Sequence, residues 1–268
     1  MLRPKMAAAA LTASLALLPI ASQAHDYWIM PGTFDPAPGT LLEARFTSGH
    51  SYFVDESVPD VTGFRAFERL PDGREIALAY QQLNASRATL SAAMLGEGTY
   101  MLGAVSTRPQ FWSRTKTGYA PGQKTEVPDA VVTTRYLKSI KTFVTVGQPS
   151  DGWDAVLGHE IELVPLANPT TLSAGDRLAV RVLLHGRPVA DAEVHAIHQG
   201  FESEERESAA STATNAEGET EIVLDRPGPW LVYARVERDA PPASGVDREN
   251  LRAYLLTRVA RPKAGARP

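Results

Sequence analysis

Residues 177–184 read Arg-Leu-Ala-Val-Arg-Val-Leu-Leu, and this stretch indicates the fold class of the chain. Its apolar side chains alternate with other residues, so that one face would carry Leu178, Val180, Val182 and Leu184. A period of two residues is that of a β-strand with one face in a core. The turn signal at 185–188, His-Gly-Arg-Pro, leads into a second alternating stretch at 192–196. A β-hairpin is therefore predicted here.

The sequence around this hairpin predicts an immunoglobulin-like β-sandwich over residues 159–262. Further strands are expected at 219–224, 230–236 and 251–259, separated by turn signals such as Pro227-Gly228-Pro229. Roughly seven short strands with no convincing helix are typical of such a sandwich. Trp230 is expected to be a bulky core residue rather than a binding platform.

The preceding segment predicts a second β-sandwich over residues 25–147. Residues 40–47 alternate, with Leu42, Ala44 and Phe46 on one face, and Asp72-Gly73 is typical of a hairpin turn. Residues 106–130 are rich in Pro and Gly and are expected to form a long irregular loop. Residues 148–158 read as a linker and residues 263–268 as a tail. The expected fold class is all-β, with two β-sandwich domains.

Composition restricts the chemistry. The 268 residues include no cysteine, which excludes disulfides and thiolate metal sites and leaves imidazole, carboxylate, thioether and backbone ligands. Twenty prolines and twenty glycines favour short strands joined by turns. The net charge of −4 argues against a nucleic-acid partner, which would need a basic face.

Residues 1–24 resemble a cleaved secretory signal. Arg3 and Lys5 precede an apolar run from Ala7 to Ile20, and Ser22 and Ala24 provide the small residues of a cleavage site. The apolar run is shorter than a membrane span, which needs about 20 residues. We expect a periplasmic mature protein with no transmembrane segment. Its net charge would be −6, because the signal removes two basic residues and no acidic one.

Cleavage after Ala24 would make His25 the first residue of the mature protein. A terminal histidine offers its α-amine and a ring nitrogen, which together chelate a transition metal such as nickel, cobalt, copper or zinc. His50 follows a predicted strand after Gly49 and is the natural second imidazole. Asp26 and Asp55 are candidates for orienting these ligands, and Glu56 offers a further carboxylate. A surface loop is the competing interpretation of His50.

The other histidines attract weaker predictions. His195 and His198 are three residues apart, so a strand would point them to opposite faces and prevent a shared metal. We expect His195 to face solvent beside Glu193. Nucleophile elbows, phosphate-binding loops and zinc-protease motifs are absent from the sequence, and no catalytic residue is predicted.

The mature chain resembles a family of exported bacterial proteins whose domain has no assigned function. The most specific segment is 24–31, Ala-His-Asp-Tyr-Trp-Ile-Met-Pro. Further similar segments are Gly49-His50, 135–138 with 146–147, 162–169, Gly175-Asp176 and Pro229-Trp230. This family was formerly described as a nickel-uptake component of the NikM type, and some members accompany nickel or cobalt transporters. The resemblance implies a role in metal supply and a metal-uptake transporter of the inner or outer membrane as partner.

Three functions are compatible with these features. The preferred hypothesis is a non-enzymatic periplasmic protein that binds a divalent transition metal through His25 and His50. The first alternative is a copper-dependent oxidative enzyme that uses the same terminal chelate. The second is a metal-free binding or assembly module, in which residues 25–28 begin an edge strand and their aromatic side chains pack inward.

Overall fold

The computed structural model describes residues 25–81, 83–201 and 208–262. The predicted signal, residues 1–24, and the predicted tail, residues 263–268, lie outside the described residues. The first half contains β1 (Asp26–Pro31), β2 (Thr40–Gly49), β3 (Phe64–Arg69), β4 (Glu75–Leu78), β5 (Arg87–Met94), β6 (Gly98–Ser106), β7 (Gln110–Arg114), β8 (Tyr119–Pro121) and β9 (Val132–Val146). The second half contains β10 (Ile161–Pro165), β11 (Arg177–Leu184), β12 (Arg187–Pro188), β13 (Glu193–His198), β14 (Ala210–Ala213), β15 (Glu219–Val223), β16 (Gly228–Asp239) and β17 (Arg248–Val259).

Three sheets organise these strands. The N-terminal sheet has the order β1-β2-β5, and the C-terminal sheet consists of β10, β11, β12 and β15. The shared sheet runs β14-β13-β16-β17-β9-β6-β3-β4, with β7 and β8 attached beside β9. Short 3-10 helices at Val61–Gly63, Pro169–Thr171 and Pro242–Ser244 lie in the connections.

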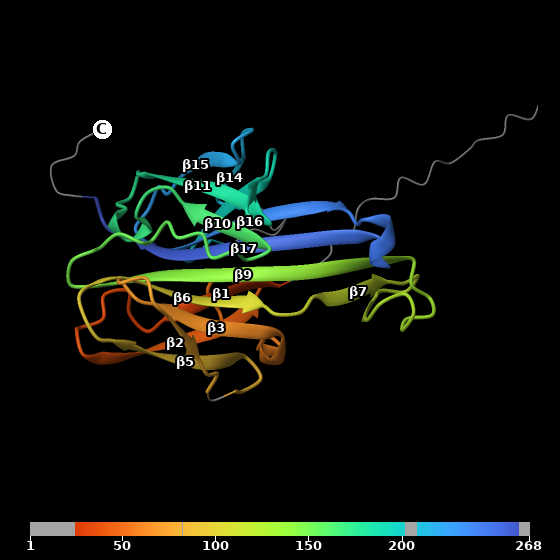
Figure 1. Cartoon of the computed structure of the whole chain (residues 1–268), viewed down its shortest axis with the longest axis horizontal. Coiled ribbons are helices and arrows are strands. Elements are labelled where there is room, and N and C mark those ends of the chain that lie inside the picture. Colours follow the sequence, from red (N-terminus) through yellow and green to blue (C-terminus); the bar gives the residue numbers. More distant parts are fainter. Residues whose placement is uncertain (1–24, 82, 202–207, 263–268) are drawn as a thin grey trace, which may run out of the picture.

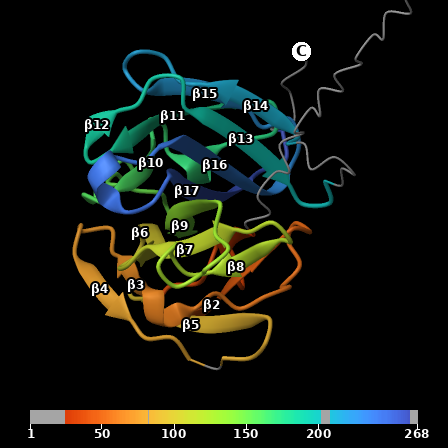
Figure 2. The same ribbon diagram turned by 90° about the vertical axis from the view of Figure 1, so that its right-hand side faces the viewer.

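The two halves of the chain meet in the middle of the shared sheet. There β9 and β17 pair in parallel, with Leu137 beside Leu251 and Thr142 beside Leu256. Figure 1 shows these two long strands side by side, with the earlier strands on one side and the later strands on the other. Figure 2 shows the same two lobes from the end of the molecule.

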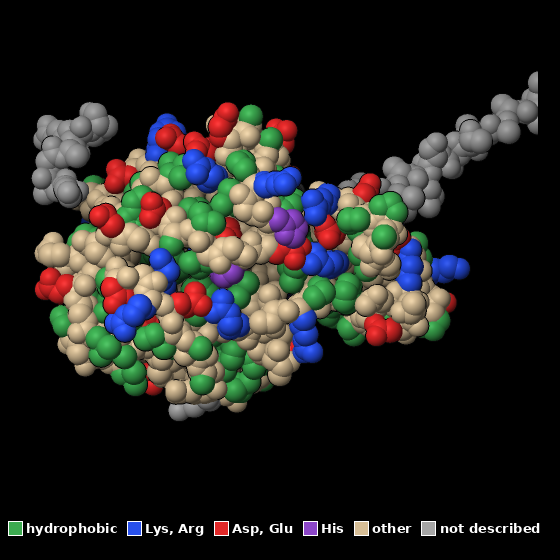
Figure 3. All heavy atoms as spheres, in the orientation of Figure 1, with side chains coloured by type: hydrophobic (Ala, Val, Ile, Leu, Met, Phe, Trp, Pro, Cys, Tyr) green, Lys and Arg blue, Asp and Glu red, His purple; other side chains and the backbone are tan. Residues whose placement is uncertain are grey.

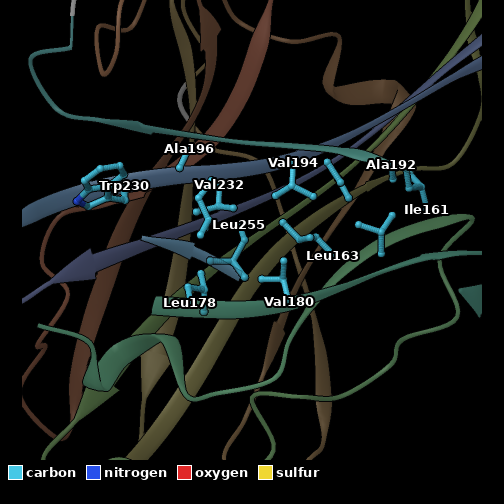
Figure 4. Packing of buried hydrophobic residues seen from close by; sticks show 14 of the residues in the cluster. Ile161, Leu163, Leu178, Val180, Ala192, Val194, Ala196, Trp230, Val232 and Leu255 are labelled. Carbon is cyan, nitrogen blue, oxygen red and sulfur yellow. The ribbon is translucent and has the colours of Figure 1, made fainter. Parts of the chain in front are cut away.

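Each face of the shared sheet is covered by a different partner sheet, which creates two cores. The C-terminal core lies between the shared and C-terminal sheets and includes Leu178, Val180, Trp230 and Val232 (Figure 4). The N-terminal core lies against the N-terminal sheet and includes Trp28 and Phe46. β9 contributes to both cores, since Phe143 belongs to the first and Val144 to the second. Burial on both faces explains why its sequence does not alternate cleanly.

The all-β prediction with sandwich packing is confirmed. The strand predicted from residues 177–184 is β11, with its alternating apolar side chains buried. Trp230 is 1% exposed and is a core residue as expected. The segment 106–130 is less irregular than predicted, because β7 and β8 form a hairpin within it. Edge pairing with β9 supplies hydrogen bonds that the local sequence pattern does not reveal.

The boundaries 25–147, 148–158 and 159–262 stay a prediction. The structure adds that the shared sheet crosses these boundaries, since β9 belongs to the first predicted domain and β17 to the second.

Acidic and basic side chains are intermixed over the face shown in Figure 3. Within the described ranges, no helix is both long and apolar enough to cross a membrane.

Candidate metal site

Strand pairing brings His25 and His50 together. β1 and β2 are antiparallel, and Asp26 pairs with Gly49 at the end of the ladder. The residue before Asp26 and the residue after Gly49 therefore lie opposite each other. These residues are His25 and His50, which are 25 positions apart in the sequence. Their convergence follows directly from the register of this hairpin-like pair.

The two imidazoles are in direct contact. Their ring centres are 4.2 Å apart, and the planes meet edge to face at 84°. An ion bound to one nitrogen of each ring at about 2.0 Å would hold the ring centres roughly 4.5 to 6.3 Å apart for angles of about 90° to 180° at the metal. The observed separation lies just below that range, so a shared ion would need the two rings to move slightly apart. The ring nitrogens can thus serve one ion with small side-chain movements.

Glu56 orients His50. Its carboxylate oxygen Oε2 lies 3.5 Å from His50 Nδ1 and accepts a hydrogen bond of 3.0 Å from the backbone N–H of His50. Oε1 accepts a second backbone hydrogen bond, 2.7 Å long, from Ser51. A carboxylate beside Nδ1 favours a proton on that nitrogen and leaves Nε2 as the ligand. Nε2 is buried and has no hydrogen-bond partner among the described residues.

Gly49 makes room for this carboxylate. A Cβ atom at residue 49 would lie 2.9 Å from Glu56 Cδ and 3.1 Å from Oε2. Real side chains essentially never approach so closely, so any larger residue would displace Glu56. The glycine is required for close approach, not for a left-handed backbone.

The protonation of the site follows from its surroundings. Burial lowers the pKa of His25, and the neighbouring His50 lowers it further. Partial burial alone would raise the pKa of Glu56, but hydrogen bonds from Ser51 and His50 outweigh it and lower the pKa. His25 is therefore biased toward the neutral imidazole that binds metals, while Glu56 is biased toward its anion. His25 Nδ1 has a long contact of 3.4 Å to the Ser48 hydroxyl.

Asp26 does not face the imidazoles. Its carboxylate accepts hydrogen bonds from the Tyr52 hydroxyl, from Arg252 at 2.9 Å and from the Tyr254 hydroxyl at 3.0 Å. Asp26 is 8% exposed, so this network is buried beneath the site. Its carboxylate is thus occupied by β17 and by the loop that follows His50.

Asp55 is also directed elsewhere. Its Oδ2 forms ion pairs of 3.1 Å with both Arg45 and Arg87. The structure thus places the orienting carboxylate at Glu56, one residue beyond the predicted Asp55. The sequence indicated a carboxylate near His50 because Asp55 and Glu56 follow it closely, one directly after the other. Only the path of the loop decided which of them faces His50.

Two imidazoles, those of His25 and His50, are the metal donors that the described residues bring together at this site. Among the residues that the structure describes, no three His, Cys, Asp or Glu side chains gather as a metal-binding group. A third nitrogen would have to come from the α-amine that signal cleavage after Ala24 would create. This donor set of amine and imidazole nitrogens fits nickel, cobalt, copper and zinc.

The neighbouring aromatic residues pack rather than present a face. Trp28 is fully buried and contacts Tyr52 and Phe53, with ring centres 5.9 and 5.5 Å apart. Tyr27 is 8% exposed and packs on Phe46.

The remaining histidines lie apart from one another. His195 stacks on Tyr233 and approaches Glu193, whereas His198 packs on Trp230 in the other core. These positions agree with the expected opposite faces of one strand. His195 is only partly exposed, with 18% of its side chain accessible.

Comparison with known proteins gives a family without an assigned function. The family model described as "Domain of unknown function (DUF4198)" matches residues 22–238. No curated protein of known function matches the chain. The family match therefore spans both lobes, and the description of the family names no activity.

Solved structures show only distant similarity. A DUF4785 family protein from Legionella pneumophila is 11% identical over 77% of this chain, with a TM-score of 0.27. The chain spans about half of that protein, 51%. The D0–D1 domain of intimin is 12% identical, covering 85% of this chain and 96% of that one, with a TM-score of 0.22. A two-domain fibronectin type III segment of chicken tenascin is 12% identical, covering 86% and 97%, with a TM-score of 0.22.

Proposed function

We propose that this chain, which belongs to the family described as Domain of unknown function (DUF4198), binds a divalent transition metal through His25 and His50. The ion would be cargo, held by the α-amine and ring nitrogen of a processed His25 and by Nε2 of His50. Nickel or cobalt supply to an uptake transporter is the role that the NikM-type resemblance supports. The mature protein would act in the periplasm.

The observation that carries this proposal is the contact between the two imidazoles. Their ring centres lie 4.2 Å apart at the end of a strand pair, and one ring is oriented by a carboxylate. Buried polar atoms are ordinarily hydrogen-bonded, yet Nε2 of His50 has no partner among the described residues. A metal ion would satisfy that nitrogen. The third donor of the proposed site would be the α-amine that cleavage after Ala24 would create.

Proton competition sets the expected pH dependence. The free α-amine, with an ordinary pKa of about 7.7–8.0, must lose its proton before it coordinates. Because the pKa of His25 is lowered, protons compete less with a metal ion for this ring than for a free imidazole. Affinity should therefore fall as the pH drops below about 8, with the amine as the main cause.

The test is a copper(II) titration of two forms of the protein. Copper is the most sensitive probe because nitrogen sites bind it most tightly among the divalent ions of this row. One form begins at His25, and the other carries a single glycine before it. We expect the first to bind one equivalent and the second to bind far more weakly. Nickel, cobalt and zinc titrations of the first form then rank the affinities of the site for these ions.

Two controls separate the rival functions. His50→Ala should weaken binding, while His185→Ala, which changes an exposed turn histidine, should leave it unchanged. Equal affinities for the two N-terminal forms would contradict the chelate. Protein isolated from periplasm without metal by elemental analysis, and unable to take it up, would favour the metal-free assembly module. Peroxide-dependent turnover by the copper form would favour the oxidative enzyme.

A further inference from the structure

A buried carboxylate connects the candidate metal site to the far end of the chain. Asp26 Oδ1 accepts a hydrogen bond of 2.9 Å from Arg252 and one of 3.0 Å from the Tyr254 hydroxyl. Both donors lie on β17, more than 220 positions later in the sequence. The side chains of Arg252 and Asp26 are 8% and 12% exposed. This group, with Tyr52, is here called the Asp26 latch.

The Asp26 latch acts on both ligand-bearing segments. Asp26 directly follows His25, so fixing its carboxylate restricts the backbone of the terminal residue. Tyr52 lies two residues after His50 and donates to Asp26 Oδ2. One carboxylate thus holds the start of β1, the loop after β2 and the middle of β17. Charge-assisted hydrogen bonds of this kind are stronger and more directional than neutral ones.

The neighbouring contacts do not supply an equivalent restraint. The side chain of His25 itself makes a contact of 3.4 Å to Ser48, which is long for a hydrogen bond. β1 is an edge strand whose only ladder partner is β2. A chain terminus at such an edge is prone to fray unless it is tied down. Burial of Trp28 and Ile29 anchors the middle of β1, and the buried Asp26 carboxylate ties its first residue.

We propose that Arg252 and Tyr254 are positioning residues, through which the C-terminal lobe holds His25 in register with His50. This inference rests on the proposed metal-binding function. It assigns the second lobe a part in assembling the site, instead of the role of a spacer. The ligands stay those of the first lobe, and β17 supplies the rigid support behind them.

The test uses Tyr254→Phe, which removes one hydroxyl donor and keeps the ring. Its matched control is Tyr100→Phe, because Tyr100 is also buried and its hydroxyl also forms hydrogen bonds, with the backbone of Gly96. We expect Tyr254→Phe to speed amide hydrogen exchange of Trp28, whose N–H points toward β2, in the metal-free protein. It should weaken copper(II) binding by roughly tenfold. Tyr100→Phe should change neither.

The two readouts separate the inference from the proposed function. If the wild-type protein binds no copper(II), the proposed function fails, and the exchange measurement still decides whether the latch holds β1. Unchanged exchange of the Trp28 amide in Tyr254→Phe would overturn the latch. Equal acceleration in both variants would also overturn it, because that pattern reports general destabilisation. Asp26→Asn, which keeps the shape, should reproduce the effect of Tyr254→Phe.

Discussion

His25 and His50 meet edge to face, with ring centres 4.2 Å apart, at the open end of the β1–β2 pair. Their contact depends on a single register, in which Asp26 lies opposite Gly49. A slip of one residue would turn each side chain to the other face of the sheet. The core prevents such a slip, since Trp28 and Ile29 are fully buried. Packing of the strand thus fixes its register, and the hydrogen bonds of Asp26 hold its first residue.

Glu56→Gln should weaken metal binding without unfolding the protein. The amide keeps an acceptor oxygen for the backbone but loses the negative charge that faces His50 Nδ1 at 3.5 Å. We expect copper(II) affinity to fall about tenfold, the usual range for loss of a carboxylate behind a histidine ligand. Nitrogen-15 shifts of the metal-free protein should show more of the His50 tautomer with Nδ1 unprotonated. An unaltered tautomer ratio would show that Glu56 does not orient the ring.

Gly49→Ala should damage the same site by a steric route. The added Cβ would lie 2.9 Å from Glu56 Cδ, so the carboxylate must move away from His50. Copper(II) titration should show a loss of affinity similar to that of Glu56→Gln. Gly96→Ala is the matched control, because a Cβ there would meet no atom within 4 Å. If both glycine variants bind copper(II) like the wild type, the tight packing at Gly49 has no role in binding.

Lys141→Met should strongly destabilise the protein. Lys141 and Glu162 are 1% and 0% exposed, and Lys141 Nζ lies 2.8 Å from Glu162 Oε2 in a buried ion pair. Removing the lysine leaves a buried anion with two backbone donors, from Leu157 and His159. We expect a loss of about 3 kcal/mol in urea unfolding. Arg74→Met, which breaks an exposed ion pair with Asp72, should leave the stability nearly unchanged.

His159 should make the protein sensitive to mild acid. Burial, aided by the nearby Lys141, lowers the pKa of His159 to about 4. The unfolded chain, with a pKa near 6.5, binds the proton more readily, so stability is complete above about pH 6.5 and declines as the pH falls toward 4. The loss should approach about 3 kcal/mol at pH 4.

His159→Leu should remove this dependence. Neither ring nitrogen of His159 has a hydrogen-bond partner among the described residues, so little is lost at neutral pH. Urea unfolding at pH 7 and pH 4.5 measures the difference between the two proteins. Parallel loss of stability in both would assign the acid sensitivity to other groups, such as Glu162.

The candidate site was only partly accessible to prediction. His25 and His50 stand out because few histidines occur and one follows an expected cleavage site. The choice between Asp55 and Glu56 was not accessible, since adjacent acids in a loop have the same local signal. In the structure Arg45 and Arg87 bind Asp55, and backbone N–H groups bind Glu56. Arg45 on β2 and Arg87 on β5 thus hold Asp55 away from His50, and this leaves Glu56 as the carboxylate beside the ring.

The sequence by itself determined the class of the fold and the chemistry available to it. Alternation in residues such as 177–184 encodes half-buried strands because side chains on a strand have a period of two. The lack of cysteine leaves nitrogen, oxygen and thioether donors. Only the tertiary structure decided that β9 and β17 join in one sheet and that Asp26 meets Arg252. Such pairings join segments far apart in the chain, and they are selected by the burial of both faces of a shared sheet, which no local pattern records.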